Sequence, residues 1–258
     1  MSQPTDSVLY DKQGHIALIT LNRPEAKNAI DPGMDQRLAE IWYEFRDDDQ
    51  LHVAILTGAG DAFCAGADRD TWFTRWVDAD PAQVRSHVEG IGFAGLTRGL
   101  RDLNKPIIAA INGWTLGGAL ELALACDIRI ASQLARFGLP LVRYGFHTGD
   151  GGITRLIHTC GIGVALDLQL TGEPIDAQRA LACNLVTRVV APDELLPAAF
   201  NVANLILANN QTAIRSAKRT TLDLIGRTLE DQLRLEAWNG YTLSQGQDIL
   251  AAFAVQQR

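Results

Sequence analysis

Short apolar runs that alternate with helical patterns constrain the fold of this 258-residue chain more than any other feature. Runs typical of strands cover residues 15–21 (HIALITL), 52–58 (HVAILTG), 105–113 (KPIIAAING) and 128–132 (IRIAS). The centre of the second run is continuously apolar, as expected for a strand that is covered on both faces. Strands that alternate with helices predict an α/β fold with largely parallel strands.

Helical patterns fill the intervals between these runs. In residues 31–46, the apolar positions recur on one face of a predicted helix: Met34, Leu38, Ile41, Trp42 and Phe45. Further helices are predicted over 84–103, from the glycines at 151–152, near 163–170 and over 177–181, with a last short strand at 185–190. From residue 192 onward the pattern is helical, so this region must pack on the core or on another subunit.

A doubly wound dinucleotide-binding fold is the main alternative for such an order of elements. It requires G-x-G-x-x-G directly after the first strand. The segment that follows the first run here is NRPEAKNA, which contains no glycine. The sequence therefore argues against a nucleotide site of that type.

Composition and charge exclude several classes of partner. The net charge is −7 and no block of Lys or Arg is present, which argues against nucleic acid, although local cations or backbone amides can still bind a small anionic substrate. The sequence contains no run of about 18 apolar residues, so it predicts no membrane span. The first residues lack a secretory pattern, so we expect a cytoplasmic protein.

The cysteines and histidines do not predict a metal site. Four cysteines are scattered along the chain without CxxC spacing: Cys64, Cys126, Cys160 and Cys183. The five histidines show no recognisable ligand spacing. We expect reduced thiols and no protein-bound metal.

Two glycine-containing loops follow predicted strands, CAGAD (64–68) and LGGALELA (116–123). Each joins a strand end to the start of a helix, where backbone N–H groups are unpaired and carry the positive end of the helix dipole. Two such amides could converge on one oxygen, which is the geometry of an oxyanion hole. The alternative is a pair of ordinary tight turns.

Glu121 lies within the second loop region, three residues after Gly118, in an otherwise apolar stretch. An ionisable carboxyl in such surroundings is costly unless it is paired or functional. One turn past the glycines, it should face the same space as their amides. We therefore favour an acid/base role with a raised pKa over an exposed or structural role.

Several stretches together resemble the crotonase, or enoyl-CoA hydratase/isomerase, superfamily. They are ITLNRPEAKNAI, VAILTGAGDAFCAGAD, KPIIAAINGWTLGGALELALACDIRIAS, GGITRLI and LTGEPIDAQRALACNLVTRVVAPDEL. They occur in the family's order across nearly the whole chain. The resemblance implies a spiral core of repeated ββα units over residues 1–195 and a helical region for trimers or hexamers over 196–258.

The resemblance also implies an acyl-CoA substrate and no metal or redox cofactor. The thioester oxygen would lie between the amides of Ala67 and Gly118, with Glu121 as the main acid/base. The CoA moiety and acyl group would contact the backbone of the two loops and the segment after the first strand. The implied substrate-binding positions are Lys27, Ala29, Ala65, Ala67, Asp68, Gly117, Gly118 and Leu141.

One departure from the family pattern concerns Leu141. Family hydratases use a second glutamate after the proline of an FGxPE segment, whereas this chain reads FGLPLV. Leucine can neither position water nor move a proton, so ordinary two-glutamate hydration of crotonyl-CoA is not expected. Nearby Asp150 could supply a substitute carboxylate or could instead cap the helix that begins at Gly151. For His147, in the same loop and without a sequence-local partner, a structural role is favoured over a catalytic one.

Other positions have two interpretations. Trp72, Phe73 and Trp76 could line a bulky acyl pocket or belong to the core. Trp238 and Tyr241 could reach a neighbouring subunit's site or pack a trimer. The last residues, AAFAVQQR, offer only Arg258 as a cation for CoA phosphates.

The function that the sequence predicts is that of an enoyl-CoA hydratase/isomerase-family enzyme working through a stabilised enolate. A C–C bond hydrolase or decarboxylase of the same fold, assisted by Asp150 or His147, is the second enzymatic hypothesis. A non-catalytic acyl-CoA-binding homologue is the third, although pure binding would not require Glu121.

Overall fold

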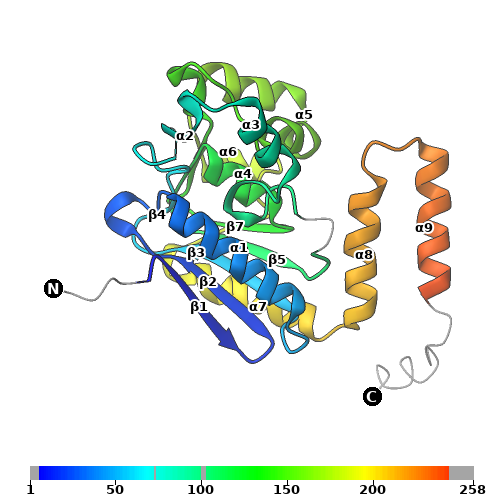
Figure 1. The fold of residues 1–258 in the computed structure, drawn as a ribbon. Helices are drawn as coiled ribbons and strands as arrows, with labels where there is room; N and C mark the ends of the chain where they lie inside the picture. Colours follow the sequence, from blue (N-terminus) through cyan, green and yellow to red (C-terminus); the bar gives the residue numbers. More distant parts are fainter. Residues whose placement is uncertain (1–5, 73, 100–102, 244–258) are drawn as a thin grey trace.

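The computed structural model describes residues 6–72, 74–99 and 103–243, and these form an α/β core with a helical C-terminal extension (Figure 1). The larger sheet has the strand order β1-β2-β3-β5-β7-β10. Its strands are β1 (Val8–Gln13), β2 (Ile16–Leu21), β3 (Val53–Gly58), β5 (Ile107–Ile111), β7 (Ile128–Ser132) and β10 (Arg188–Val190). All pairs are parallel except the β1–β2 hairpin.

A second, four-stranded sheet has the order β4-β6-β8-β9. Its strands are β4 (Ala62–Cys64), β6 (Trp114–Leu116), β8 (Arg136–Gly138) and β9 (Ile175–Asp176). Consecutive strands β3 and β4, β5 and β6, and β7 and β8 each place one strand in each sheet before the chain turns into helix. This repetition is the ββα spiral, so the predicted fold class is confirmed.

The described helices are α1 (Pro32–Asp47), α2 (Thr74–Val77), α3 (Pro81–Glu89), α4 (Gly118–Ala125), α5 (Gly152–Thr171), α6 (Ala177–Ala182), α7 (Leu195–Leu207), α8 (Gln211–Leu224) and α9 (Leu229–Leu243). The apolar face predicted for α1 is buried, and the Asp31 carboxylate caps the helix by accepting from the Met34 amide. α7 packs on the opposite face of the larger sheet through Leu195, Ala199 and Val202.

The single helix predicted over 84–103 is wrong. α3 ends at Glu89, and the chain then passes through left-handed backbone at Gly92 (φ 78°), Ala94 (φ 53°) and Gly95 (φ 66°). An added Cβ at Gly95 would lie 2.4 Å from Ala39 Cα, so the chain here packs directly on the backbone of α1. This close packing, rather than helix propensity, determines the local structure.

α8 and α9 stand beside the core as an antiparallel pair (Figure 1). The exposed face of α9 includes Leu229, Leu233, Trp238 and Tyr241, each more than half exposed in the single chain. The predicted role of this region in trimers or hexamers and the domain boundary at residue 195 stay predictions. Residues Phe73 and Arg258, discussed above, lie outside the described residues.

Two further findings concern the described part of the chain. None of its helices is long and apolar enough to cross a membrane. Its four cysteines are free thiols, three of them buried, and it contains no cluster of three His, Cys, Asp or Glu side chains suited to a metal ion.

Candidate functional site

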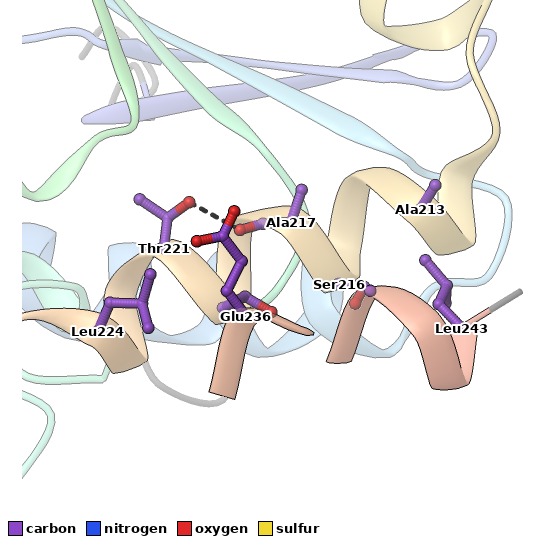
Figure 2. A pocket seen from close by; sticks show the side chains of 9 residues that line it. Ala213, Ser216, Ala217, Thr221, Leu224, Glu236 and Leu243 are labelled. Atoms are coloured by element: carbon purple, nitrogen blue, oxygen red, sulfur yellow. Dashed lines mark hydrogen bonds between the residues drawn. The ribbon is translucent and has the colours of Figure 1, made fainter. Parts of the chain in front are cut away.

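Two concave regions of the described part of the chain differ in the chemical groups that line them. Figure 2 shows the smaller, a groove of about 300 Å³ between α8 and α9, where Glu236 lies near Ala217 and Thr221. The larger is a cavity of about 1110 Å³ that both glycine loops enter. Acidic, basic, aromatic and backbone groups converge only in the larger of these two, so it is the candidate site.

The segment after β2 forms one part of the cavity wall. Lys27 (φ 52°) and Asn28 (φ 57°) adopt left-handed backbone, which is uncommon for residues other than glycine. The buried Asn28 amide group holds the turn in place by donating to the carbonyl oxygens of Ala59 and Ala62, both at 2.8 Å. Lys27 and Ala29 therefore line the cavity, with the Lys27 ammonium paired to Asp61 at 2.5 Å.

The CAGAD loop is attached to this segment through backbone hydrogen bonds. Ala65 N donates to Lys27 O at 2.9 Å, and Ile30 N donates to Gly66 O at 2.8 Å. Gly66 has a φ of 97°, which turns the following peptide toward the cavity. Within the described residues, the amide N–H of Ala67 donates to no acceptor.

The second glycine loop lies directly beside the first. An added Cβ at Gly66 would be 3.2 Å from Gly118 N, so the two loops approach each other without intervening side chains. Gly117 (φ 56°) is the N-cap of α4, and Gly118 is the first residue of the helix. The Gly118 N–H also has no acceptor within the described part of the chain. Two unpaired amides from adjacent loops thus border the same cavity.

Glu121 lies one turn further along α4 and is only 4% exposed. Its Oε1 accepts from Asp150 N at 2.7 Å and from Gly152 N at 3.1 Å, at the start of α5. Burial, followed by the charge of Asp150, raises the pKa of Glu121 to about 7, against the opposing effect of the two amides. A carboxyl with this pKa can both accept and release a proton near neutral pH.

Asp150 is held on the opposite side by several donors. Its Oδ2 accepts from His87 Nε2 at 3.2 Å, and its Oδ1 contacts Arg98 Nε and Thr97 Oγ1, both at 3.3 Å. Burial alone would raise the pKa of Asp150, but the hydrogen bond from His87 and the charge of Arg98 bring it below its ordinary value. The carboxylate is therefore ionised and well bonded, which suits a fixed charge better than a mobile base.

The hypothesis that Asp150 caps the following helix is wrong. The N-cap of α5 is Gly151, and the Asp150 carboxylate turns away to His87 and Arg98. The carboxylate that receives the first amide of α5 belongs instead to Glu121. The physical reason is that the side chains of His87 and Arg98 both bind the Asp150 carboxylate and draw it away from the end of the helix.

Asp150→Asn is expected to lower the pKa of Glu121, because it removes the negative charge near this carboxyl and leaves the positive charge of Arg155. An NMR titration of isotopically labelled glutamate carboxyls measures this change independently of any activity. Asp167→Asn removes a charge from the exposed side of α5 and should leave the titration unchanged. A Glu121 pKa that is the same in wild type and Asp150→Asn would contradict the electrostatic coupling.

The remaining predicted site residues are placed as follows. Leu141 lines the cavity and contacts the glycine loop, since an added Cβ at Gly117 would be 3.3 Å from its Cδ2. Ala65 and Gly117 also line it. His147 is an exposed residue at its edge, with Nδ1 donating to Thr148 O at 2.7 Å. Asp68 is not among the described residues that line the cavity: its carboxylate binds Thr71 Oγ1 and Arg23, and its amide donates to Ile30 O at 2.9 Å.

Sequence reasoning missed the side chains that surround Asp150. His87, Phe93 and Arg98 all line the cavity, although they belong to the segment predicted as one helix. Trp72 and Trp76, for which two interpretations were open, line it as well. A lone histidine such as His87 gives no local signal, because its partner Asp150 is 63 residues away.

Comparison with known proteins groups this chain with one family. Residues 11–254 match the family described as Enoyl-CoA hydratase/isomerase. The short-chain-enoyl-CoA hydratase of Clostridium acetobutylicum is 39% identical over 215 residues, covering 83% of this chain and 80% of that protein. The (E)-benzylidenesuccinyl-CoA hydratase of Thauera aromatica is 38% identical over 222 residues, covering 83% and 82%.

Solved structures agree with this grouping. The crystal structure of an enoyl-CoA hydratase from Mycobacterium tuberculosis H37Rv superposes with a TM-score of 0.87 and 33% sequence identity. The match covers 98% of this chain and 97% of that one. The match therefore spans the residues that form both glycine loops and the C-terminal helices.

Proposed function

The chain belongs to the enoyl-CoA hydratase/isomerase family, and from this premise we propose that it acts on an acyl-CoA thioester through an enolate, with Glu121 as its single catalytic carboxyl. The observation that supports this most directly is the position of Glu121. A buried carboxyl with a pKa of about 7 borders the same cavity as the unpaired amides of Ala67 and Gly118.

The two amides supply the electrostatic part of the mechanism. They donate to the thioester oxygen, which gains negative charge when an enolate forms. Because they are fixed by the loops and by the start of α4, they need little rearrangement as the charge develops. Lys27 and the backbone around Ala29 and Ala65 are the groups proposed to contact the CoA moiety.

Glu121 performs the proton transfers. In hydration of a 2-enoyl thioester, a water oxygen bonds to C3 and its proton passes to the Glu121 carboxylate. The electrons of the C2–C3 double bond move to the thioester oxygen, and the enolate then takes the proton from Glu121 at C2. One carboxyl thus completes the addition of H and OH. In isomerisation the same group can carry a proton between C2 and C4.

A panel of CoA thioesters followed by liquid chromatography and mass spectrometry tests this proposal. Hydration adds the mass of water, isomerisation changes retention alone, and C–C cleavage gives smaller products. We expect bond changes at C2 to C4 and slow hydration of crotonyl-CoA. Cleavage as the main reaction would support the hydrolase hypothesis, and binding without any turnover would support the non-catalytic one.

Leu141→Glu is expected to increase the hydration of crotonyl-CoA by about tenfold or more, because it restores a second carboxyl that can position water. Leu141 is half-buried against Gly117 and lines the cavity, so a glutamate there would face the substrate. Leu141→Gln is the matched control that changes size and polarity without adding a carboxyl. Equal rates for the two variants would show that the missing glutamate does not limit hydration.

A further inference from the structure

A group of side chains that we call the aromatic wall extends from the oxyanion loops into the cavity. It consists of Trp72, Trp76, Val84, His87, Val88 and Phe93. It begins beside Gly118, where an added Cβ would be 2.7 Å from the Phe93 ring. Phe93 contacts the edge of Trp72 at a centroid distance of 5.2 Å, and Trp76 contacts His87 at 4.8 Å. Any acyl group whose thioester oxygen lies at Gly118 has this wall next to it.

The side chains that α3 contributes to the aromatic wall expose apolar surface to solvent. Val84 is 45% exposed and Val88 is 52% exposed, and both line the cavity together with His87 from the same helix. Burying apolar surface of this kind against a ligand is favourable in proportion to its area. A short crotonyl group is too small to cover this surface as well as Phe93 and the two tryptophans, whereas a bulky cyclic group can.

His87 is the titratable side chain in this wall and the one that can offer an acceptor nitrogen, and its other nitrogen is bonded to Asp150. The ionised Asp150 carboxylate can only accept, so Nε2 carries the hydrogen of their 3.2 Å contact. In the neutral ring Nδ1 is then an acceptor, and it has no partner among the described residues. A pure hydrocarbon lying over His87 would remove Nδ1 from water without replacing its hydrogen bond.

We infer that the acyl group of the substrate is bulky and cyclic and carries a hydroxyl group that donates to His87 Nδ1. The inference rests on the proposed function, because it assumes that the cavity holds a CoA thioester. Asp150 acts here as a positioning residue, since it fixes the ring and its tautomer through Nε2. The aromatic wall selects for the ring, and His87 selects for the hydroxyl.

Calorimetric titration with saturated thioesters separates binding from turnover, because these compounds have no double bond to hydrate. The probes are butyryl-CoA, 3-phenylpropanoyl-CoA and the three hydroxyphenyl isomers of the latter. For wild type we expect 3-phenylpropanoyl-CoA to bind about tenfold more tightly than butyryl-CoA. We expect one hydroxyphenyl isomer to bind about tenfold more tightly again.

Three variants test whether His87 is the residue responsible for the tighter binding of the hydroxylated thioester. His87→Phe retains a ring of similar size and should abolish the gain from the hydroxyl while keeping the gain from the ring. His87→Asn retains a polar atom close to the position of Nδ1 and should keep part of the hydroxyl gain. His158→Phe makes the same change at an exposed position on α5, outside the cavity wall described above, and should bind like wild type. Thermal unfolding confirms that each variant is folded.

The outcomes distinguish this inference from the proposal on which it rests. Equal affinity for all five thioesters, or an unchanged hydroxyl gain in His87→Phe, would overturn the inference and leave the CoA site intact. Failure of every thioester to bind, butyryl-CoA included, would overturn the proposed function and the inference with it.

Discussion

Glu121→Gln is expected to lower turnover by about a hundredfold or more while changing thioester affinity by less than about threefold. Glutamine keeps the size of the side chain and an oxygen that can accept from the Asp150 and Gly152 amides. It cannot accept and return a proton. The loss should therefore fall on kcat, because binding groups such as the loop amides remain in place.

Exchange of the C2 hydrogen of butyryl-CoA in D₂O measures enolate formation even if the preferred acyl group is unknown. Wild type should incorporate deuterium and Glu121→Gln should not. Glu236→Gln, the same change in the groove between α8 and α9, is the control and should exchange like wild type (Figure 2). Wild-type exchange rates in Glu121→Gln would show that Glu121 is a structural carboxyl.

The same variant should alter how stability depends on pH. The unfolded chain releases the Glu121 proton near pH 4.5, whereas the folded protein keeps it up to about pH 7. Between these values the folded state binds more protons, so the free energy of unfolding falls as pH rises, by about 3 kcal/mol in total. Glu121→Gln has no carboxyl to titrate at this position and does not lose this stability. The free energy of unfolding of the variant, relative to that of wild type, should therefore increase as pH rises over this interval. Urea unfolding at several pH values measures it.

Much of the fold could be predicted because it follows from local apolar periodicity. The five buried residues of α1 recur at helical spacing, and strands β2, β3 and β5 of the larger sheet have apolar centres. Strands β4 and β6 contain only three residues each, and the sequence around them reads as loop. They are strands because they pair with each other across the smaller sheet, and such pairing leaves no mark on a short segment.

The candidate site also has a part that local sequence predicts and a part that it does not. Glu121 could be predicted, since a carboxyl one turn after two glycines in an apolar helix is a local pattern. The environment of Asp150 could not, because its partners His87, Thr97 and Arg98 lie more than 50 residues earlier in the chain. Local sequence also suggested that Asp150 caps a helix, which was wrong because donors from that distant segment bind its carboxylate.

Gly118→Pro is expected to reduce C2 exchange and turnover by about a hundredfold or more, because proline has no N–H to donate to the thioester oxygen. Gly118 is the first residue of α4, a position where proline is tolerated because its N–H is unpaired within the helix. The helix itself should therefore form. The substitution also adds atoms close to the Phe93 ring, where an added Cβ would be 2.7 Å away.

Gly118→Ala separates these two effects. Alanine places the same Cβ against Phe93 but keeps the amide N–H, so it measures the cost of the steric contact alone. We expect a loss of about tenfold or less for alanine and a further loss of about tenfold or more for proline. Circular dichroism and size-exclusion chromatography establish that both variants fold and assemble like wild type. If folded proline and alanine variants exchanged the C2 hydrogen at the same rate, the Gly118 amide would have no part in stabilising the enolate, and Ala67 alone or another donor would have to supply that charge stabilisation.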